Sequence, residues 1–451
     1  MSPLRQVIVI GDHPALHRGF STVGRHIARH LHGTGRWRVR FLARYPRPAH
    51  GAAEPYEVFE GAEEGEDEGT WRLTGMLRGL LEDADDGSPV VPVVSIGTPF
   101  DQCLVLESID EAGVRSRVRL VAYAPVNVAP IAPGTADVLR RFDVIVPFTD
   151  HARRALDHGV GASGPTVSGP IPHCVDTGVF RPPAPEARRR TRMEIFGLED
   201  DDLLVGYFGR NSGHKHPDMA LSIFAAFARG LYVTCRACAQ VTVADDDPLD
   251  GFATHPARCG VCGSDQMVSG ARRERARLYL HTELLEAEAR ALSGGWDLPR
   301  LARLYGISDQ LMFNDALQIG EGVPADELAR RMGACDIHFL PYEGGGWELT
   351  VLETAACGVA NVVTDTAAPP EYAAPFSELV PTRLRLLDGA GLRGFIDPGG
   401  AVQALVRLAD DPDHRRGLAD QGPRTAEHYG WEHIGPQWDH LLTAVVDGRA
   451  P

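Results

Sequence analysis

Four cysteines in two matched pairs form a metal-binding pattern. Cys235 and Cys238 lie in "CRAC", Cys259 and Cys262 lie in "CGVC", and 20 residues separate the two pairs. Two C-x-x-C knuckles at this spacing are typical of a tetrahedral zinc site with four thiolate ligands. Because four thiolates leave no coordination position open for a substrate, the sequence predicts a structural zinc.

Two cations follow an apolar segment in the second half of the chain. Arg210 and Lys215 lie in "GRNSGHK", between the expected strand "DLLVGYF" and a helix expected to begin near Pro217. Both side chains can therefore reach an anion at the carboxyl end of that strand. Cations already in place there would stabilise negative charge that develops on a leaving phosphate group, so both are candidate catalytic residues.

The first loop of the chain offers polar groups before a helix. "GDHPALHRGFSTVG" places Gly19 near a helix N-terminus, where backbone amides can approach a phosphate or a sugar. We therefore predict that Gly19 binds part of the same ligand. His13 and His17 of this loop, and Asn127 after a later strand, are candidate contacts to a second substrate.

The elements that must position these residues alternate along the chain. "RQVIVIG", "PVVSIG", "RLVAYAPV" and "DVIVPF" predict buried strands with helices between them, and the first helix is expected to be capped by Ser21 or Thr22. A second series runs from "DLLVGYF" to "ANVVTD". The pattern predicts an α/β protein with two Rossmann-like domains, residues 1–183 and 184–428, facing each other across a cleft. Residues 232–268 would be a zinc-knuckle insertion, and residues 429–451 a helix that returns to the first domain.

Several segments in order resemble one enzyme family. "IPHCVDTGVFRP", "GYFGRN" followed by "HKHPD", "LYLH", "LTVLETAACGVANVVTD" and "YGWEHIGPQW" are similar to the family-four retaining glycosyltransferases of the GT-B fold, over nearly the whole chain. The resemblance implies transfer of a sugar from a nucleoside diphosphate with retained configuration, and no metal at the reaction centre. It assigns Arg210 and Lys215 to the diphosphate and Glu353 to the ribose hydroxyls. The remaining donor contacts that it implies are Gly346, Trp347, Leu349 and Thr350.

One carboxylate of that family's E-x(7)-E motif is displaced. Gly345 stands where the first glutamate is usual, and Glu348 stands where a glycine is usual. Glu343 and Glu348 flank the empty position, and either can replace the missing acid from a new angle. We prefer Glu348, as a catalytic residue, because it is nearer to the helix that carries Glu353 and follows Trp347. Alternatively, the donor sugar lacks the hydroxyl that the first glutamate reads.

Composition excludes several classes of protein. The formal charge of -16 disfavours nucleic acid as a partner, because such binding needs Lys and Arg to neutralise phosphates. The acidic segments 54–69 and 82–87 are expected to be solvated loops. No apolar run approaches the ~20 residues of a membrane span. The apolar run near the N-terminus is also shorter than the core of a signal peptide, which has about 7 to 15 residues. The expected location is the cytoplasm.

The sequence therefore predicts a retaining glycosyltransferase that moves a hexose-like sugar from a nucleotide sugar to a small or polar acceptor. The excess of Arg, Ala, Gly and Asp over Lys, Asn and Ile favours a GC-rich bacterium, in which such enzymes serve specialised metabolism. Two alternatives stay open: a GT-B protein that binds a nucleotide sugar without transferring it, and a zinc-ribbon interaction module on a GT-B scaffold. The base, the sugar, the acceptor and the oligomeric state are not specified by the sequence.

Overall fold

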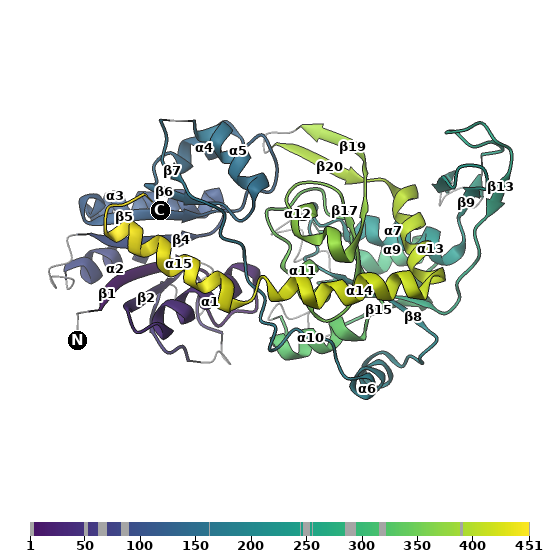
Figure 1. Ribbon diagram of the computed structural model, residues 1–451, viewed down its shortest axis with the longest axis horizontal. Helices are drawn as coiled ribbons and strands as arrows, with labels where there is room; N and C mark the ends of the chain where they lie inside the picture. Colours follow the sequence, from purple (N-terminus) through teal and green to yellow (C-terminus); the bar gives the residue numbers. More distant parts are fainter. Residues whose placement is uncertain are drawn as a thin grey trace. The chain divides into compact units, whose positions relative to one another are not determined.

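The chain forms two compact units in the computed structural model (Figure 1). Unit 1 comprises Met1–Cys174, Asp388–Gly391 and Tyr429–Pro451, and unit 2 comprises Val175–Leu387 and Leu392–His428. The structure describes residues 4–48, 53–61, 70–82, 90–161, 163–243, 245–246, 253–254, 256–284, 295–314, 322–387 and 391–450.

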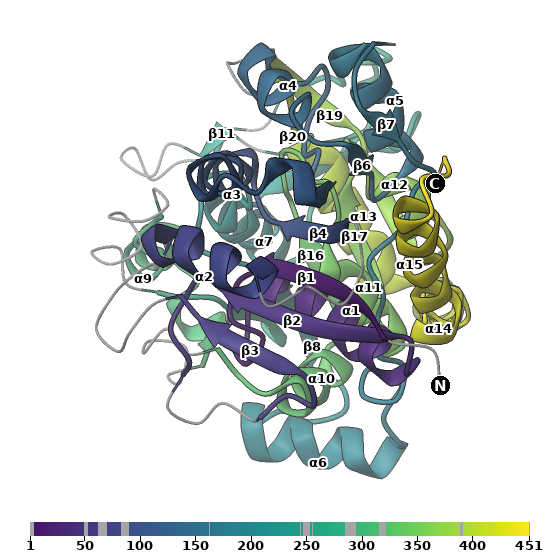
Figure 2. The same cartoon turned by 90° about the vertical axis from the view of Figure 1, so that its left-hand side faces the viewer.

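Unit 1 is built on a parallel sheet of seven strands. Their order is β3-β2-β1-β4-β5-β6-β7, and Figure 2 shows β3, β2, β1 and β4 side by side. The strands are β1 (Arg5–Gly11), β2 (Trp37–Ala43), β3 (Glu57–Glu60), β4 (Val91–Ile96), β5 (Val118–Tyr123), β6 (Val144–Val146) and β7 (Thr166–Val167). The helices are α1 (Gly19–Gly33), α2 (Thr70–Glu82), α3 (Pro99–Ala112), α4 (Pro133–Leu139), α5 (Asp150–Val160) and α15 (Trp431–Val446). Strand order reverses between β1 and β4, as in Rossmann-like sheets.

The last helix of the chain belongs to unit 1. On β2, the indole Nε1 of Trp37 donates a hydrogen bond of 2.7 Å to Asp439 of α15, and Arg36 forms an ion pair with the same carboxylate. Trp438 packs edge-on against Tyr123, with ring centroids 4.7 Å apart. These buried contacts fix α15 beside the sheet of unit 1.

Unit 2 is built on a parallel sheet of six strands in the order β15-β14-β8-β16-β17-β18. They are β8 (Leu203–Phe208), β14 (Ala276–His281), β15 (Leu311–Phe313), β16 (Ile337–Leu340), β17 (Ala360–Thr364) and β18 (Ser377–Val380). The main helices are α6 (Pro185–Phe196), α7 (Pro217–Arg229), α9 (Leu298–Leu304), α10 (Ala325–Ala334), α11 (Leu349–Ala356), α12 (Pro370–Ala373), α13 (Pro398–Asp410) and α14 (Pro412–Glu427). A hairpin of β19 (Thr382–Leu387) and β20 (Leu392–Ile396) precedes α13. The strand order reverses between β8 and β16, where α/β sheets commonly bind ligands at the carboxyl ends.

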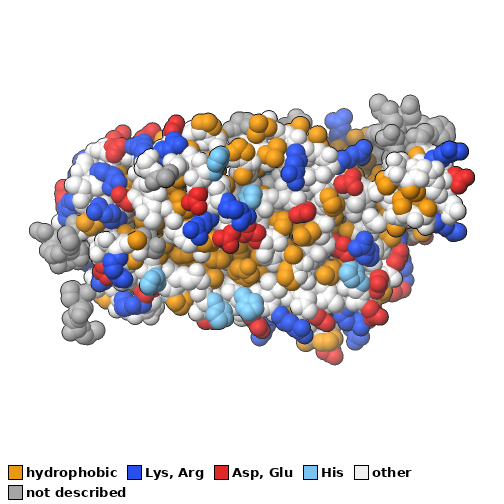
Figure 3. All heavy atoms as spheres, turned by 45° about the horizontal axis from the view of Figure 1, so that its top comes forward, with side chains coloured by type: hydrophobic (Ala, Val, Ile, Leu, Met, Phe, Trp, Pro, Cys, Tyr) orange, Lys and Arg blue, Asp and Glu red, His pale blue; other side chains and the backbone are white. Residues whose placement is uncertain are grey.

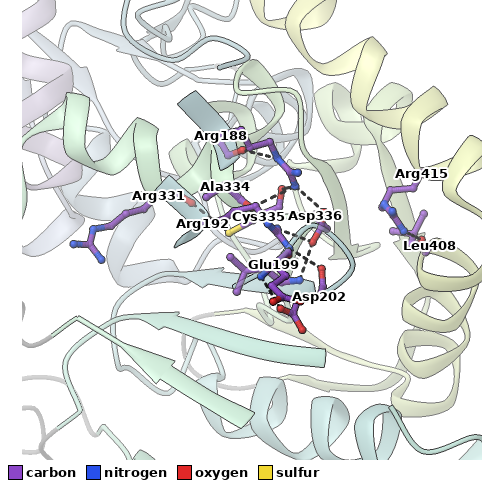
Figure 4. Close-up of polar contacts among 12 residues, drawn as sticks. Arg188, Arg192, Glu199, Asp202, Arg331, Ala334, Cys335, Asp336, Leu408 and Arg415 are labelled. Carbon is purple, nitrogen blue, oxygen red and sulfur yellow. Dashed lines mark hydrogen bonds and ion pairs between the residues drawn. The ribbon is translucent and has the colours of Figure 1, made fainter. Parts of the chain in front are cut away.

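A buried arginine fixes the amino ends of β8 and β16 (Figure 4). Arg192 of α6 is 1% exposed and donates to the carbonyl oxygens of Ala334, at 2.9 Å, and Asp202, at 2.6 Å. It also contacts Asp336, whose carboxylate accepts the backbone N–H of Leu204 at 2.8 Å. Because both strands begin at this network, it fixes their amino ends relative to each other.

The cysteine-containing segment forms a small antiparallel sheet between α7 and β14. Its strands are β9 (Tyr232–Cys235), β10 (Val241–Val243) and β13 (Met267–Ser269), in the order β10-β9-β13. This sheet packs on α13, where Gln403 donates a hydrogen bond of 2.9 Å to the carbonyl oxygen of Ala239. A Cβ at Gly399 would lie 2.5 Å from the carbonyl oxygen of Val241, so only glycine permits this close approach.

Two local expectations from the sequence were wrong. Helix α1 begins at Gly19 with Arg18 as its N-cap, so Ser21 lies buried within the first turn and neither Ser21 nor Thr22 caps the helix. The acidic segment 54–69 contains strand β3, whereas its residues 62–69, and residues 83–87 of the second acidic segment, lie outside the described part of the chain.

Candidate functional site

The loop of residues 209–216 joins β8 to α7 and is shaped by a buried tyrosine. Tyr207 Oη lies 3.2 Å from the carbonyl oxygen of Arg210 and 3.3 Å from that of Lys215, so one hydroxyl can bridge both ends of the loop. A Cβ at Gly209 would lie 2.9 Å from this hydroxyl, which explains the glycine. The Arg210 side chain is exposed and forms no ion pair or hydrogen bond within the described residues. It is therefore available to an anion at the start of α7.

Lys215 and Glu348 form a close ion pair between the loops that follow β8 and β16. The ammonium Nζ lies 2.5 Å from each carboxylate oxygen, and the two side chains are 16% and 6% exposed. The Glu348 carboxylate also occupies the space above Gly345, since a Cβ there would lie 2.2 Å from Oε1. The structure thus brings together the two residues that the sequence assigned to catalysis on separate grounds.

The backbone of Glu348 is held by Tyr372. The N–H of Glu348 donates to the tyrosine hydroxyl at 2.9 Å, and that hydroxyl donates to the Glu348 carbonyl oxygen at 3.3 Å. Trp347 stacks on the Tyr372 ring with a centroid distance of 4.2 Å. Next in the chain, half-buried Leu349 begins α11, and Thr350 donates a hydrogen bond of 3.0 Å to the Phe208 carbonyl oxygen of β8. Of the predicted donor contacts, Thr350 is therefore hydrogen-bonded to β8, and Trp347 is stacked on Tyr372.

Glu343 is engaged by a different set of cations. Its carboxylate lies 3.1 Å from His216 Nε2 and pairs with Arg393 of β20, and its carbonyl oxygen accepts the Gly394 N–H at 2.8 Å. Burial lowers the pKa of His216, but hydrogen bonds to Asp218 and Glu343 outweigh burial and raise it to about 9. Glu343 thus ties the hairpin to the N-terminus of α7, while Glu348 is the acid that meets Lys215.

Glu353 is a buried carboxyl group one turn into α11. It is 8% exposed, and burial raises its pKa to about 7. In the part of the chain that the structure describes, no hydrogen bond or cation at this carboxyl group offsets the effect. On a helix, residues three apart share a face, so Glu353 lies on the same side as Thr350, which reaches the end of β8. A buried carboxyl group without a protein partner is costly, and it suits a ligand that supplies hydroxyl donors.

Three residues of this region were missed by sequence reasoning. His216 adopts a left-handed backbone with φ 51° as the N-cap of α7, Asn211 binds both Glu283 and Trp296 through its amide, and Tyr372 holds Glu348. Trp296, for example, is paired with Asn211 across 85 positions of sequence. Only for His216 did the sequence offer a signal. His216 precedes Pro217 in "HKHP", and a residue before proline avoids helical backbone, which indicates that the helix begins after it.

Unit 1 places its four predicted contacts at the carboxyl ends of its strands. Gly19 is exposed and opens α1, His17 is exposed in the loop before it, and Asn127 is exposed after β5. His13 is 3% exposed, and its Nδ1 accepts the Ala15 N–H at 3.1 Å, which fixes the ring. Burial lowers the pKa of His13 to about 4, so it is neutral at pH 7.

The four cysteines of the insertion converge on one point. Their sulfur atoms lie within 4.8 Å of one another, with 3.6 Å between Cys235 and Cys262 and 3.5 Å between Cys238 and Cys259. The two knuckles form the same type of turn. In the first, the N–H of Ala239 donates to the carbonyl oxygen of Cys235, and in the second, the N–H of Gly263 donates to that of Cys259. In each turn the donating residue has positive φ, 61° and 72°. Tetrahedral zinc with bonds of about 2.3 Å needs sulfur atoms about 3.8 Å apart, so this cluster fits zinc.

Charge is mixed on the face of the molecule that Figure 3 shows. In the view of Figure 3, Lys and Arg side chains alternate with Asp and Glu, and no continuous basic stripe crosses that face. Within the described residues, no helix has both the length and the apolar character to span a membrane.

Several solved structures share this architecture. Sucrose-phosphate synthase from Thermosynechococcus elongatus aligns with a TM-score of 0.68 at 15% identity, covering 98% of this chain and 100% of that one. HepE from Anabaena in complex with UDP aligns with a TM-score of 0.61 at 13% identity, covering 98% and 100%. A glycosyltransferase from Rickettsia africae gives a TM-score of 0.63 at 9% identity, covering 98% of each chain. The chain has the GT-B fold.

Sequence comparison adds a partial relative. The MMP alpha-(1->4)-mannosyltransferase of Mycolicibacterium hassiacum is 28% identical over 129 residues, which are 28% of this chain and 29% of that protein. The chain therefore matches less than a third of this relative's length. No protein-family model matches the chain.

Proposed function

We propose that the protein is a retaining glycosyltransferase that uses a nucleoside-diphosphate sugar. The observation that carries the proposal is the buried Glu353 of α11, whose side chain has no partner among the described residues. The loop before this helix meets the loop of Arg210 and Lys215 through the Lys215–Glu348 pair. An ionised carboxylate can accept both hydroxyls of a ribose, and two cations can hold a diphosphate. The complex of HepE with UDP, a protein of the same fold, supports a nucleotide as the ligand.

Each residue then has a chemical role in the transfer. The bond between the anomeric carbon and the phosphate oxygen breaks, and the acceptor hydroxyl oxygen bonds to that carbon on the same face. The hydroxyl proton passes to the departing phosphate oxygen, whose charge Arg210 and Lys215 stabilise without reorganisation. Glu343 and Glu348 are both paired with cations, which suits an electrostatic role better than nucleophilic attack. We assign Gly19 to the donor and His17 and Asn127 to the acceptor, whereas the burial of His13 favours a role in shaping its loop.

A donor screen tests this function. The full-length protein is incubated with UDP-glucose, GDP-glucose, ADP-glucose and GDP-mannose, and release of the nucleoside diphosphate is measured without an acceptor. We expect slow hydrolysis of one donor, because water can replace the acceptor hydroxyl. Binding of a donor by calorimetry without any release would instead identify a non-catalytic binding protein, and no binding of any donor would exclude the proposed site.

We also propose that the cysteine cluster holds one structural zinc ion through Cys235, Cys238, Cys259 and Cys262. Mass spectrometry of protein purified without added zinc should find about one zinc per chain, and Cys262→Ser should lose it, since four thiolates are needed for the closed site. Cys103→Ser, a half-buried cysteine outside the cluster, is the matched control. Protein that contains no metal and has four titratable thiols in this segment would disprove the zinc site.

Removal of zinc is expected to act on the insertion first. Chelation should increase hydrogen exchange in residues 232–268 while donor affinity, measured by calorimetry, changes little, because the ribbon packs on α13 and contributes no residue to the loops of the site. Loss of donor affinity at the same chelator concentration would show instead that the metal supports the site directly.

A further inference from the structure

The glycine run beside Glu348 has a specific spatial role. Gly344, Gly345 and Gly346 are all buried, and the carboxylate of Glu348 fills the volume into which a side chain at position 345 would project. Gly345 has no positive φ, so backbone conformation does not demand glycine there. The requirement is steric, and it comes from Glu348.

Among the described residues, the Glu348 carboxylate keeps unused capacity to accept hydrogen bonds. A carboxylate has about four acceptor positions, and the Lys215 contacts use one on each oxygen. Tyr372 fixes the backbone N–H and carbonyl oxygen of Glu348, and the ring of the preceding Trp347 stacks on Tyr372. A charged acceptor on a fixed backbone, already paired with a cation, is well suited to bind a pair of sugar hydroxyls.

We infer that Gly345 and Glu348 act as one unit, in which the carboxylate above Gly345 positions Lys215 and reads hydroxyls of the donor sugar. This inference rests on the proposed function and makes Glu348 a specificity-determining residue of the donor site. The nucleotide alone lacks the sugar hydroxyls, so Glu348 distinguishes a nucleotide sugar from its nucleoside diphosphate.

The steric part is testable without any ligand. Gly345→Ala should lower the melting temperature, because its Cβ would lie 2.2 Å from Glu348 Oε1. The same substitution in a Glu348→Ala background should cost less than half as much, since the opposing carboxylate is gone. Equal costs in the two backgrounds would overturn the coupling of these positions.

The recognition part is tested by calorimetry with UDP, GDP and ADP and with the corresponding glucose donors. In Glu348→Gln, affinity for the donor that the wild-type protein binds should fall by about tenfold or more, while affinity for its nucleoside diphosphate changes by less than about threefold. Glu378→Gln is the matched control, and it should leave the ratio of the two affinities unchanged because Glu378 of β18 is held by Arg407 and His414 and has no role in the proposed site. A parallel loss of both affinities in Glu348→Gln, or no loss, would overturn the inference.

A reciprocal exchange completes the test. Gly345→Glu combined with Glu348→Gly restores a carboxylate from the other side of the loop, and transfer should exceed that of Glu348→Gly alone by about tenfold. A folded double variant without recovery contradicts the idea that the two positions are interchangeable. If the wild-type protein binds none of the donors, the proposed function fails and this inference fails with it. If the wild-type protein transfers a sugar but Glu348→Gln leaves the ratio of donor affinity to nucleoside-diphosphate affinity unchanged, this inference alone fails.

Discussion

Replacing Lys215 or Arg210 with alanine is expected to reduce the turnover of sugar transfer by two to three orders of magnitude. In the proposed mechanism both side chains stabilise charge on the departing diphosphate, and the loss of one such contact costs roughly 3 to 4 kcal/mol in comparable sites. The measurement is a single-turnover assay with the donor found by the screen. Near-normal rates in both variants would show that the diphosphate binds elsewhere.

The two substitutions differ in their effect on stability. Arg210 is exposed, so Arg210→Ala should leave the free energy of unfolding nearly unchanged. Lys215→Ala leaves the buried Glu348 carboxylate without its cation, which costs on the order of 3 to 5 kcal/mol. Lys215→Met combined with Glu348→Gln should recover stability but not turnover. Arg190→Ala, on the exposed face of α6, is the matched control and should change neither quantity.

The features that sequence reasoning found are those with local causes. The clustering of the four cysteines follows from the two C-x-x-C turns, and the strands follow from continuous apolar runs bounded by glycine. The start of α1 was wrong because the loop after β1, and not the capping preference of Ser21, sets where the helix begins. Such tertiary effects commonly override local propensity.

The pairing within the site has causes that are not local. Lys215 and Glu348 are 133 residues apart, and their contact depends on the adjacency of β8 and β16. The choice between Glu343 and Glu348 depends on two partners, Arg393 and Tyr372, that no motif includes. The sequence predicted that an acid had moved, and only the fold shows which acid meets the lysine.

We expect Glu353 to make nucleotide affinity depend on pH. Its pKa is raised to about 7 by burial, so the group is largely protonated below that pH and ionised above it. Because the carboxylate is the form that accepts two ribose hydrogen bonds, affinity for the nucleoside diphosphate should rise between pH 6 and pH 8. Calorimetry across this range measures the effect. The phosphate group also titrates near pH 6, so the comparison is with Glu353→Gln, which should bind more weakly and lack the part of the rise that belongs to Glu353.

The same residue should make the ligand-free protein less stable as pH rises. A carboxyl group whose pKa is higher in the folded than in the unfolded state favours folding below the unfolded pKa, and this contribution is lost as pH increases through about 7. The change from the usual 4.5 to about 7 corresponds to at most about 3 kcal/mol. Glu353→Gln should therefore be more stable than the wild-type protein at pH 8 and similar to it at pH 4.5, as measured by chemical unfolding. Greater stability together with weaker nucleotide binding would identify Glu353 as a ligand-binding group retained at a cost to the fold, whereas equal nucleotide affinity in Glu353→Gln would remove its proposed contact to ribose.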